Sequence, residues 1–174
     1  MTLSPRKIIK SESGFSMIET IVAIGVILTG LISVMALLSQ GFRSVRVASD
    51  RLVASNLTQE AIEVVINIRD TNWIADQGWL TNIPFTTTGI VNYNSTDVNI
   101  VAPSSFCINL VGGVYIHGAP PCNTLFERHV EIIDRNEDID GNSVDYIEVR
   151  AIVEWTQGSI TRTVTAVDHL YDWR

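Results

Sequence analysis

Alternating oxygen-bearing side chains mark one stretch of this chain, DRNEDIDGNSVD, as a candidate site for a hard cation. Carboxylate and amide oxygens at alternate positions are what Ca²⁺ takes from a twelve-residue loop. However, Ile139 stands where such a loop needs a glycine, and Asp145 is a shorter acid than the usual glutamate. Two interpretations stay open, a calcium site and a solvated acidic turn between strands. The candidate ligands are Asp134, Asn136, Asp138, Asp140, Asn142 and Asp145.

The two cysteines of the chain, Cys107 and Cys122, offer a second kind of chemistry. In a body that lies outside the cytoplasm, such a pair is expected to form a disulfide. Zinc bound by these cysteines together with His117 or His129 is the alternative, and the spacing is not that of a zinc site. We therefore predict a disulfide between Cys107 and Cys122.

No arrangement of residues in the sequence indicates catalysis. His129 and His169 lie beside acids in strand-like segments, but no nucleophile elbow or phosphate-binding loop accompanies them. We expect no enzymatic activity and no cofactor other than the calcium considered above. The chain carries 12 basic and 19 acidic residues, a net charge of −7, which argues against general electrostatic binding of nucleic acid.

Glu19 is the one charged residue in the apolar run from Phe15 to Leu38. At about 1.5 Å per residue, a helix of these 24 residues is roughly 36 Å long, enough to cross a hydrocarbon core of about 30 Å. A carboxylate in such a segment costs free energy unless it is solvated at the interface, protonated or paired with a cation. The residue therefore needs either a place at the headgroup level or a partner.

Basic residues before this run predict its orientation. Arg6, Lys7 and Lys10 precede the apolar segment, so the N-terminus is expected in the cytoplasm and the C-terminal body outside it. A secretory signal peptide is the alternative. Its apolar core would be shorter and would end in a small-residue cleavage site, which this sequence lacks.

The remaining elements follow from hydrophobic spacing. Apolar residues recur at three- and four-residue intervals up to about residue 70, and no proline lies between Pro5 and Pro84, so we predict one long helix. Near the C-terminus, VDYIEVRAIVEW alternates as a half-buried strand does, and TQGS is a short hairpin loop. The predicted fold class is α+β, with the second half of the helix packed on an antiparallel sheet of three to four strands. The expected parts are a leader (1–14), an apolar helix half (15–38), an amphipathic helix half (39–72) and a body of loops and sheet (73–174).

The stretch GFSMIE, Gly14 to Glu19, together with the basic leader before it and the long helix after it, resembles the type IV pilins and the related pseudopilins. The close motif covers roughly the first 40 residues, and the order of helix and sheet covers the rest more loosely. The membrane half lacks the helix-bending proline usual in major pilins, and the cysteines precede the strand-rich end. These two departures favour a minor pilin or a pseudopilin.

The resemblance implies a maturation pathway and an assembly role. A prepilin peptidase would cleave between Gly14 and Phe15 and methylate the new amine of Phe15. Glu19 would then pair with the N-terminal amine of a neighbouring subunit. The implied partners are the peptidase, other pilin subunits, the inner-membrane assembly platform and membrane lipid. The implied location is the cytoplasmic membrane, as a single-pass protein, and later an extracellular or periplasmic filament.

Two alternatives remain beside the pilus subunit. A subunit of a type II secretion pseudopilus would share every feature above. A single-span protein that displays a binding or enzymatic domain would instead keep its leader, and its Glu19 would simply lie at the headgroup level.

Overall fold

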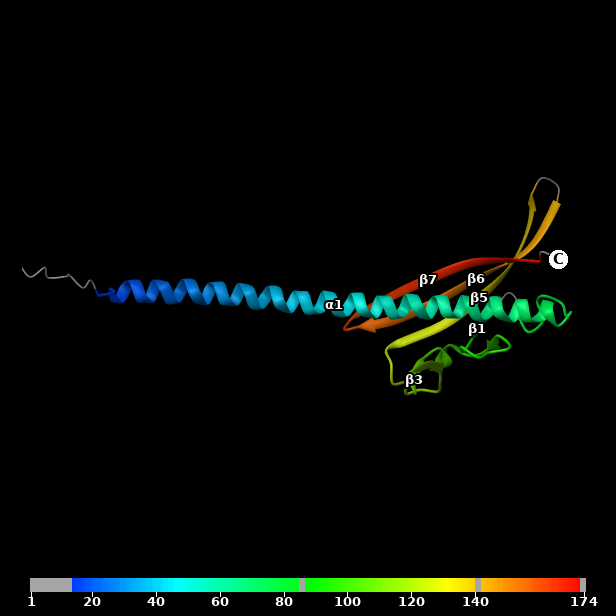
Figure 1. Cartoon of the computed structure of the whole chain (residues 1–174), viewed down its shortest axis with the longest axis horizontal. Helices are drawn as coiled ribbons and strands as arrows, with labels where there is room; N and C mark the ends of the chain where they lie inside the picture. The colour runs from blue at the N-terminus through cyan, green and yellow to red at the C-terminus, as the bar shows by residue number, and fades with distance from the viewer. Residues whose placement is uncertain (1–13, 85–86, 140–141, 173–174) are drawn as a thin grey trace, which may run out of the picture. The chain divides into compact units, whose positions relative to one another are not determined.

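The computed structural model describes residues 14–84, 87–139 and 142–172, with the backbone alone for residues 136–139 and 142–145 (Figure 1). The chain divides after Val47 into two compact units. One helix, α1, spans Met17–Ile74 and contributes to both units. The second unit also contains β1 (Thr87–Ile90), β2 (Asn99–Ile100), a short 3-10 helix (Pro103–Ser105), β3 (Ile108–Val111), β4 (Val114–His117), β5 (Phe126–Ile139), β6 (Asn142–Gln157) and β7 (Ile160–Tyr171).

The predicted long helix is confirmed, and both of its ends have a local cause. At the start, the carbonyl oxygen of Ser16 accepts the amide N–H groups of Glu19 and Thr20. At the end, Asp76 takes a left-handed conformation with a φ of 55°. The amide of Gln77 then donates to the carbonyl of Asn72, as in a helix C-cap. The side chain of Asn72 donates to the carbonyls of Trp79 and Thr81, which fixes the chain as it leaves the helix.

The main sheet is fully antiparallel, with the strand order β2-β1-β5-β6-β7. The α+β class is therefore confirmed, and the sheet has five strands instead of the three to four expected. The additional pairing comes from the Thr- and Asn-rich stretch, where β1 pairs with β5 and the two-residue β2 pairs with β1. Strands β3 and β4 form a separate two-stranded sheet. That hairpin was not predicted.

The alternation predicted for β6 is observed, and its apolar residues lie on the buried face of the sheet. Ile147, Val149, Ala151, Val153 and Trp155 are all nearly inaccessible to solvent. In the second unit, the buried face of α1 packs with these residues in two apolar clusters. Alanines on both elements permit close packing of the helix on the sheet. The buried helix residues of these clusters are Ala54, Leu57, Ala61, Val64, Val65 and Ile68.

Candidate functional site

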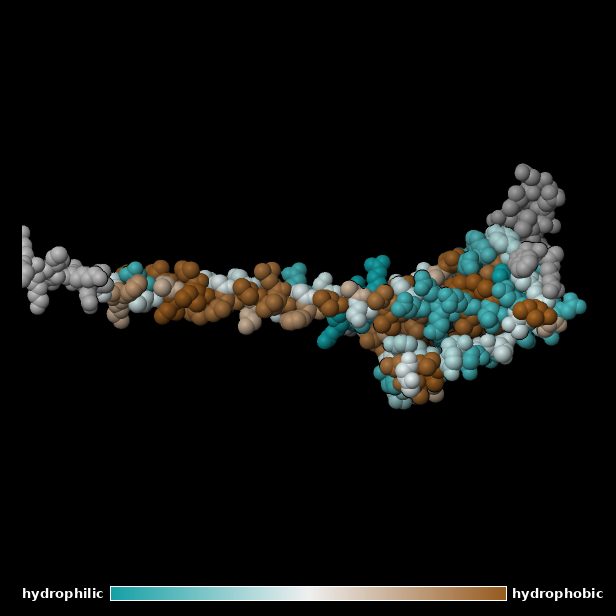
Figure 2. Space-filling view, viewed as in Figure 1, coloured by the Kyte–Doolittle hydropathy of each residue, from teal (hydrophilic) through white to brown (hydrophobic). Residues whose placement is uncertain are grey.

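The N-terminal part of α1 exposes an apolar surface along its whole length. Every described residue from Gly14 to Val45 is solvent-exposed in the isolated chain, and Figure 2 shows this segment as largely hydrophobic. Its most apolar 18-residue window has a mean hydropathy of 2.7, with no residue buried inside the protein. By length and composition, α1 is thus able to span a membrane.

Hydroxyl groups within this segment are satisfied by the helix itself. Thr29 Oγ1 donates to the carbonyls of Gly25 and Val26, and Ser33 and Ser39 donate to carbonyls one turn earlier. A polar group in hydrocarbon is tolerated when its hydrogen bond is internal. These side chains therefore need no water, and Glu19 is the charged residue of the apolar run from Phe15 to Leu38 that requires an explanation.

Glu19 lies in the first turn of α1 and is exposed. An acid at this position interacts favourably with the positive end of the helix dipole. No ion pair reaches its carboxylate from the residues that the structure describes. The carboxylate is therefore available to a cation supplied by another molecule or by another part of the chain.

Gly14 and Phe15 precede the helix and are accessible from all sides in the isolated chain. No atom lies within 4 Å of the position that a Cβ of Gly14 would take, and 79% of Phe15 is exposed. The peptide bond between them is thus open to an enzyme. The leader charges Arg6, Lys7 and Lys10 lie outside the described residues.

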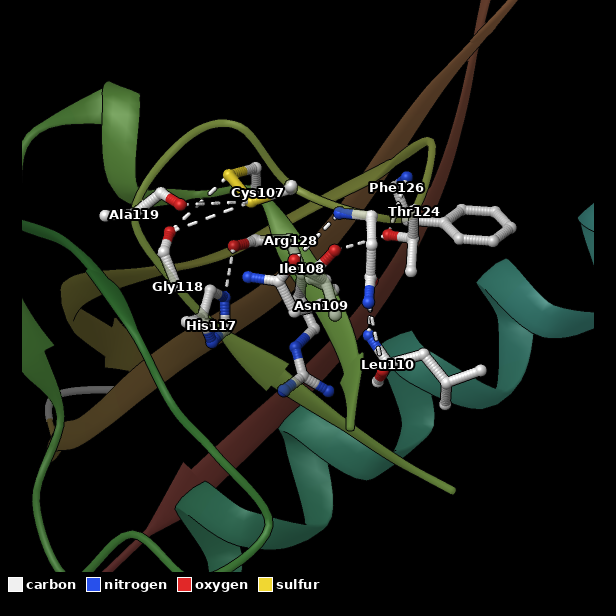
Figure 3. The surroundings of a disulfide bond; sticks show 12 residues. Cys107, Ile108, Asn109, Leu110, His117, Gly118, Ala119, Thr124, Phe126 and Arg128 are labelled. Carbon is white, nitrogen blue, oxygen red and sulfur yellow. Dashed lines mark hydrogen bonds between the residues drawn. A yellow bond between two sulfur atoms is a disulfide. The ribbon is translucent and has the colours of Figure 1, made fainter. Parts of the chain in front are cut away.

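A disulfide joins Cys107 and Cys122 at the base of the β3–β4 hairpin (Figure 3). Asn123 stabilises the hairpin through two hydrogen bonds with the backbone of Leu110. Its side chain accepts one from the Leu110 amide and donates one to the Leu110 carbonyl. The amide of Asn123 in turn donates to Asn109 Oδ1. Both sulfurs are used by the disulfide, so the alternative of zinc bound by the cysteines does not apply to the oxidised chain.

Arg128 is a buried cation that the sequence analysis missed. Its side chain is 1% exposed and forms an ion pair of 2.9 Å with Glu60 of α1. The guanidinium also donates to the carbonyls of Leu57 and Val91. Burial lowers the pKa of Arg128, and the hydrogen bond from Arg128 to Glu60 opposes this shift. The signal was present in the sequence, because Arg128 stands at an inward position of β5, between the buried Phe126 and Val130.

His117 belongs to the same network. Its Nε2–H donates to the carbonyl of Arg128 at 2.8 Å, as Figure 3 shows, and its Nδ1 lies 3.1 Å from Asn92 Oδ1. Burial lowers the pKa of His117 to about 4, against the opposing effect of the bond to the Arg128 carbonyl. The imidazole is therefore neutral at physiological pH, and its role is to join the hairpin to β5.

The other face of the sheet carries a second group of charges around Glu148. Its carboxylate is bonded by Arg135 at 3.2 Å and by Arg150, with His169 3.9 Å away. The hydrogen bond from Arg150 and the charges of both arginines lower the pKa of Glu148. Each oxygen of this carboxylate thus accepts a hydrogen bond from one arginine, which offsets its charge.

The candidate calcium ligands lie along the β5–β6 hairpin. Asp134 is exposed on β5. The backbone of β5 and β6 is paired as far as Ile139 and Asn142. These paired strands include four further candidates, whose side chains the structure does not describe: Asn136, Asp138, Asn142 and Asp145. Asp140 lies outside the described residues altogether. The choice between a calcium site and a solvated acidic turn therefore stays open.

Comparisons of the chain with protein-family models, with curated proteins and with solved structures gave no match. Function must therefore be argued from the residues themselves. Among the described residues, the feature that combines accessibility, an energetic cost and a specific chemistry is the N-terminal segment with Gly14, Phe15 and Glu19.

Proposed function

We propose that this chain is a structural subunit, of the minor type, of a type IV pilus-like filament, cleaved by a prepilin peptidase and assembled through its N-terminal helix. The observation that carries the proposal is Glu19, an exposed carboxylate in the first turn of a helix that is otherwise apolar to Leu38. A charge of this kind costs about 3 kcal/mol near the middle of a membrane. Glu19 lies nearer the start of the segment, where the cost is smaller, and a cationic partner would offset it.

The N-terminal amine of a processed chain is the partner of suitable chemistry. Cleavage between Gly14 and Phe15 creates this amine four residues before Glu19, and a methylated amine keeps its positive charge. The carboxylate of one subunit then attracts the amine of the next subunit along the filament. An uncleaved chain has no amine at Phe15, so processing and assembly are coupled by the same ion pair.

The exposed apolar surface supports the same proposal. Residues 15–38 have no buried member in the isolated chain, so they need either lipid or other helices around them. A membrane-anchored precursor uses lipid, and a filament replaces lipid by the helices of neighbouring subunits. The second unit has its own core of helix and sheet, which leaves the N-terminal segment free for this exchange.

The test is the intact mass of the full chain, expressed with an active prepilin peptidase and extracted from membranes. The expected mass is that of residues 15–174 with one added methyl group. The variant Gly14→Val, which removes the small residue before the cleavage site, is expected to keep the full-length mass. An uncleaved and unmethylated parent chain, beside a peptidase that cleaves a known prepilin in the same cells, overturns the proposal and favours the single-span alternative.

A further inference from the structure

Strand β7 is a long, regular and unpaired edge of the main sheet. It pairs with β6 along one side only, in an unbroken register from Tyr146 and Tyr171 to Gln157 and Ile160. Its twelve residues include no proline and no lysine, and no bulge interrupts the ladder. Natural sheets use such devices to prevent pairing with another strand. Inward-pointing charges are a further device of this kind, and β7 carries two of them, Arg162 and Asp168. The opposite edge, β2, is two residues long and offers little backbone for pairing.

Two charged residues of β7 lie on the side of the sheet that faces α1. Arg162 and Asp168 alternate in phase with the buried Leu170 and are half-buried. The Nε atom of Arg162 is buried and has no hydrogen-bond partner among the described residues. Among the described residues, the carboxylate of Asp168 accepts a hydrogen bond from one group, the amide of its neighbour His169, at 2.9 Å. A half-buried arginine whose Nε lacks an acceptor can receive one from water or from another molecule.

The positions of these two charges are symmetric about Thr165. Arg162 lies three residues before it and Asp168 lies three residues after it. When two copies of β7 pair antiparallel with Thr165 opposite Thr165, each Arg162 therefore stands opposite the Asp168 of the second copy. Residues directly opposite each other in an antiparallel pair point to the same face, so the two charges meet on the helix side.

We propose that β7 is a homotypic docking edge, through which two copies of this chain pair antiparallel about Thr165 and form two Arg162–Asp168 ion pairs. The occupant is a second copy because the charge pattern is self-complementary, as a two-fold interface requires. The inference does not depend on the proposed function.

The backbone geometry agrees with this register. The amide of His169 donates to Asp168, so the N–H groups of odd-numbered residues point away from β6. Thr165 is odd-numbered and thus opposes itself in a hydrogen-bonded pair. Arg162 and Asp168 then fall in a non-hydrogen-bonded pair, in which side chains lie closer together.

The pairing also specifies how the two second units are oriented. The two-fold axis of an antiparallel strand pair is perpendicular to the sheet, so the parts of α1 that cover the two sheets lie on one face and run in opposite directions.

Cysteine cross-linking of the full chain in detergent tests the register. The native cysteines are joined to each other, so an introduced cysteine supplies the one free thiol. Thr165→Cys is expected to form a covalent dimer on oxidation. Thr163→Cys is expected to form none alone but to cross-link with Val167→Cys when the two are mixed. Equal cross-linking of Thr163→Cys and Thr165→Cys alone overturns the register.

Charge reversal tests the proposed Arg162–Asp168 ion pairs, and it also shows whether the variants fold. In the Thr165→Cys background, Arg162→Asp and Asp168→Arg are each expected to lower the dimer yield roughly tenfold, because two opposite-charge pairs become like-charge pairs. A mixture of these two variants, or the double reversal in one chain, is expected to restore the yield. Restoration on mixing shows that both variants are folded. Single variants that dimerise like the parent, or a mixture that stays monomeric, overturn the proposal.

Discussion

The guanidinium of Arg128 on β5 lies 2.9 Å from the carboxylate of Glu60 on α1, between the helix and the sheet. Arg128 is 1% exposed, whereas 33% of the Glu60 side chain reaches solvent. The pair therefore fixes the helix on the sheet at one register. Removal of Glu60 leaves a buried charge unpaired, whereas removal of Arg128 leaves a carboxylate that water can still reach.

Glu60→Gln is expected to destabilise the second unit by about 1–3 kcal/mol, because it leaves a buried guanidinium without its countercharge. The measurement is denaturant unfolding of the full chain in detergent, followed by the fluorescence of the buried Trp73 and Trp155. Asp70→Asn is the matched control, since its ion pair with Arg69 is 47% exposed on the Asp70 side and its loss should cost less than about 0.5 kcal/mol. Equal effects of the two changes would contradict this account.

His117 makes stability depend on pH in the acidic range. Its pKa falls to about 4 in the folded chain because of burial, so the unfolded chain binds a proton more readily. The contribution of neutral His117 to the free energy of unfolding is therefore fully present above pH 6.5. It declines as the pH falls towards 4, by at most about 3 kcal/mol. Burial also lowers the pKa of His129, which adds to the decline in the same direction.

The variant His117→Gln isolates this contribution, because a glutamine side chain can still donate to the Arg128 carbonyl and does not titrate. Unfolding measured at pH 7 and at pH 4.5 should show a smaller difference for the variant than for the parent. His169→Gln, at an exposed position on the outer face, serves as the control. An unchanged pH difference in His117→Gln would exclude His117 as the source.

Reduction of the disulfide is expected to destabilise the β3–β4 hairpin and its attachment. Cys107 and Cys122 are separated by 15 residues, and a loop of this size contributes roughly 3 kcal/mol in the chain-entropy view. A lower denaturant midpoint with reductant is the expected result. The double variant Cys107→Ala/Cys122→Ala should start from the lower midpoint and show no response to reductant. A parent whose midpoint is insensitive to reductant would refute a stabilising role.

The long helix and strand β6 could be predicted because their signals are local and repeated. Apolar residues recur at helical spacing through α1, and alternate residues of β6 from Ile147 to Trp155 are apolar. The β3–β4 hairpin was missed, although Gly112 and Gly113, with φ values of 60° and 87°, form the kind of turn that joins two short strands. Its strands are four residues each, too short for a clear alternation.

The environment of Arg128 could not be predicted in the same way. Its inward position on β5 was readable, but two of its acceptors are backbone carbonyls, those of Leu57 and Val91. Backbone acceptors carry no side-chain signature, and these lie 71 and 37 residues away in the chain. The sheet also had to be assembled before β1 could be placed beside β5. The candidate residues of the N-terminal segment could be identified from the sequence because their chemistry depends on their sequence neighbours.

Gly89 on β1 is a position where the sheet tolerates no side chain. A Cβ there would lie 2.7 Å from Cγ1 of Val98 and 2.9 Å from the carbonyl oxygen of Asn99. Gly89→Ala is therefore expected to destabilise the second unit by about 1–3 kcal/mol and to loosen β2. Gly78→Ala is the control, because its nearest atom would be Thr81 Oγ1 at 3.6 Å, an ordinary contact. Hydrogen exchange at β1 and β2, together with the unfolding midpoint, measures both effects.

The variant Glu19→Gln is expected to block assembly without blocking processing. Glu19→Gln keeps the size of the side chain and removes its charge, so the peptidase should still cleave after Gly14 while the variant is lost from filaments. The expected result is a processed, methylated chain that stays in the membrane fraction and falls at least about tenfold in sheared filaments, since one ion pair in a medium of low dielectric contributes more than 1.4 kcal/mol. Glu63→Gln, an exposed acid of α1 in the second unit, should assemble like the parent. If Glu19→Gln enters filaments at the parental level, the carboxylate has no role in assembly, and residence at the headgroup level explains its presence in the apolar segment.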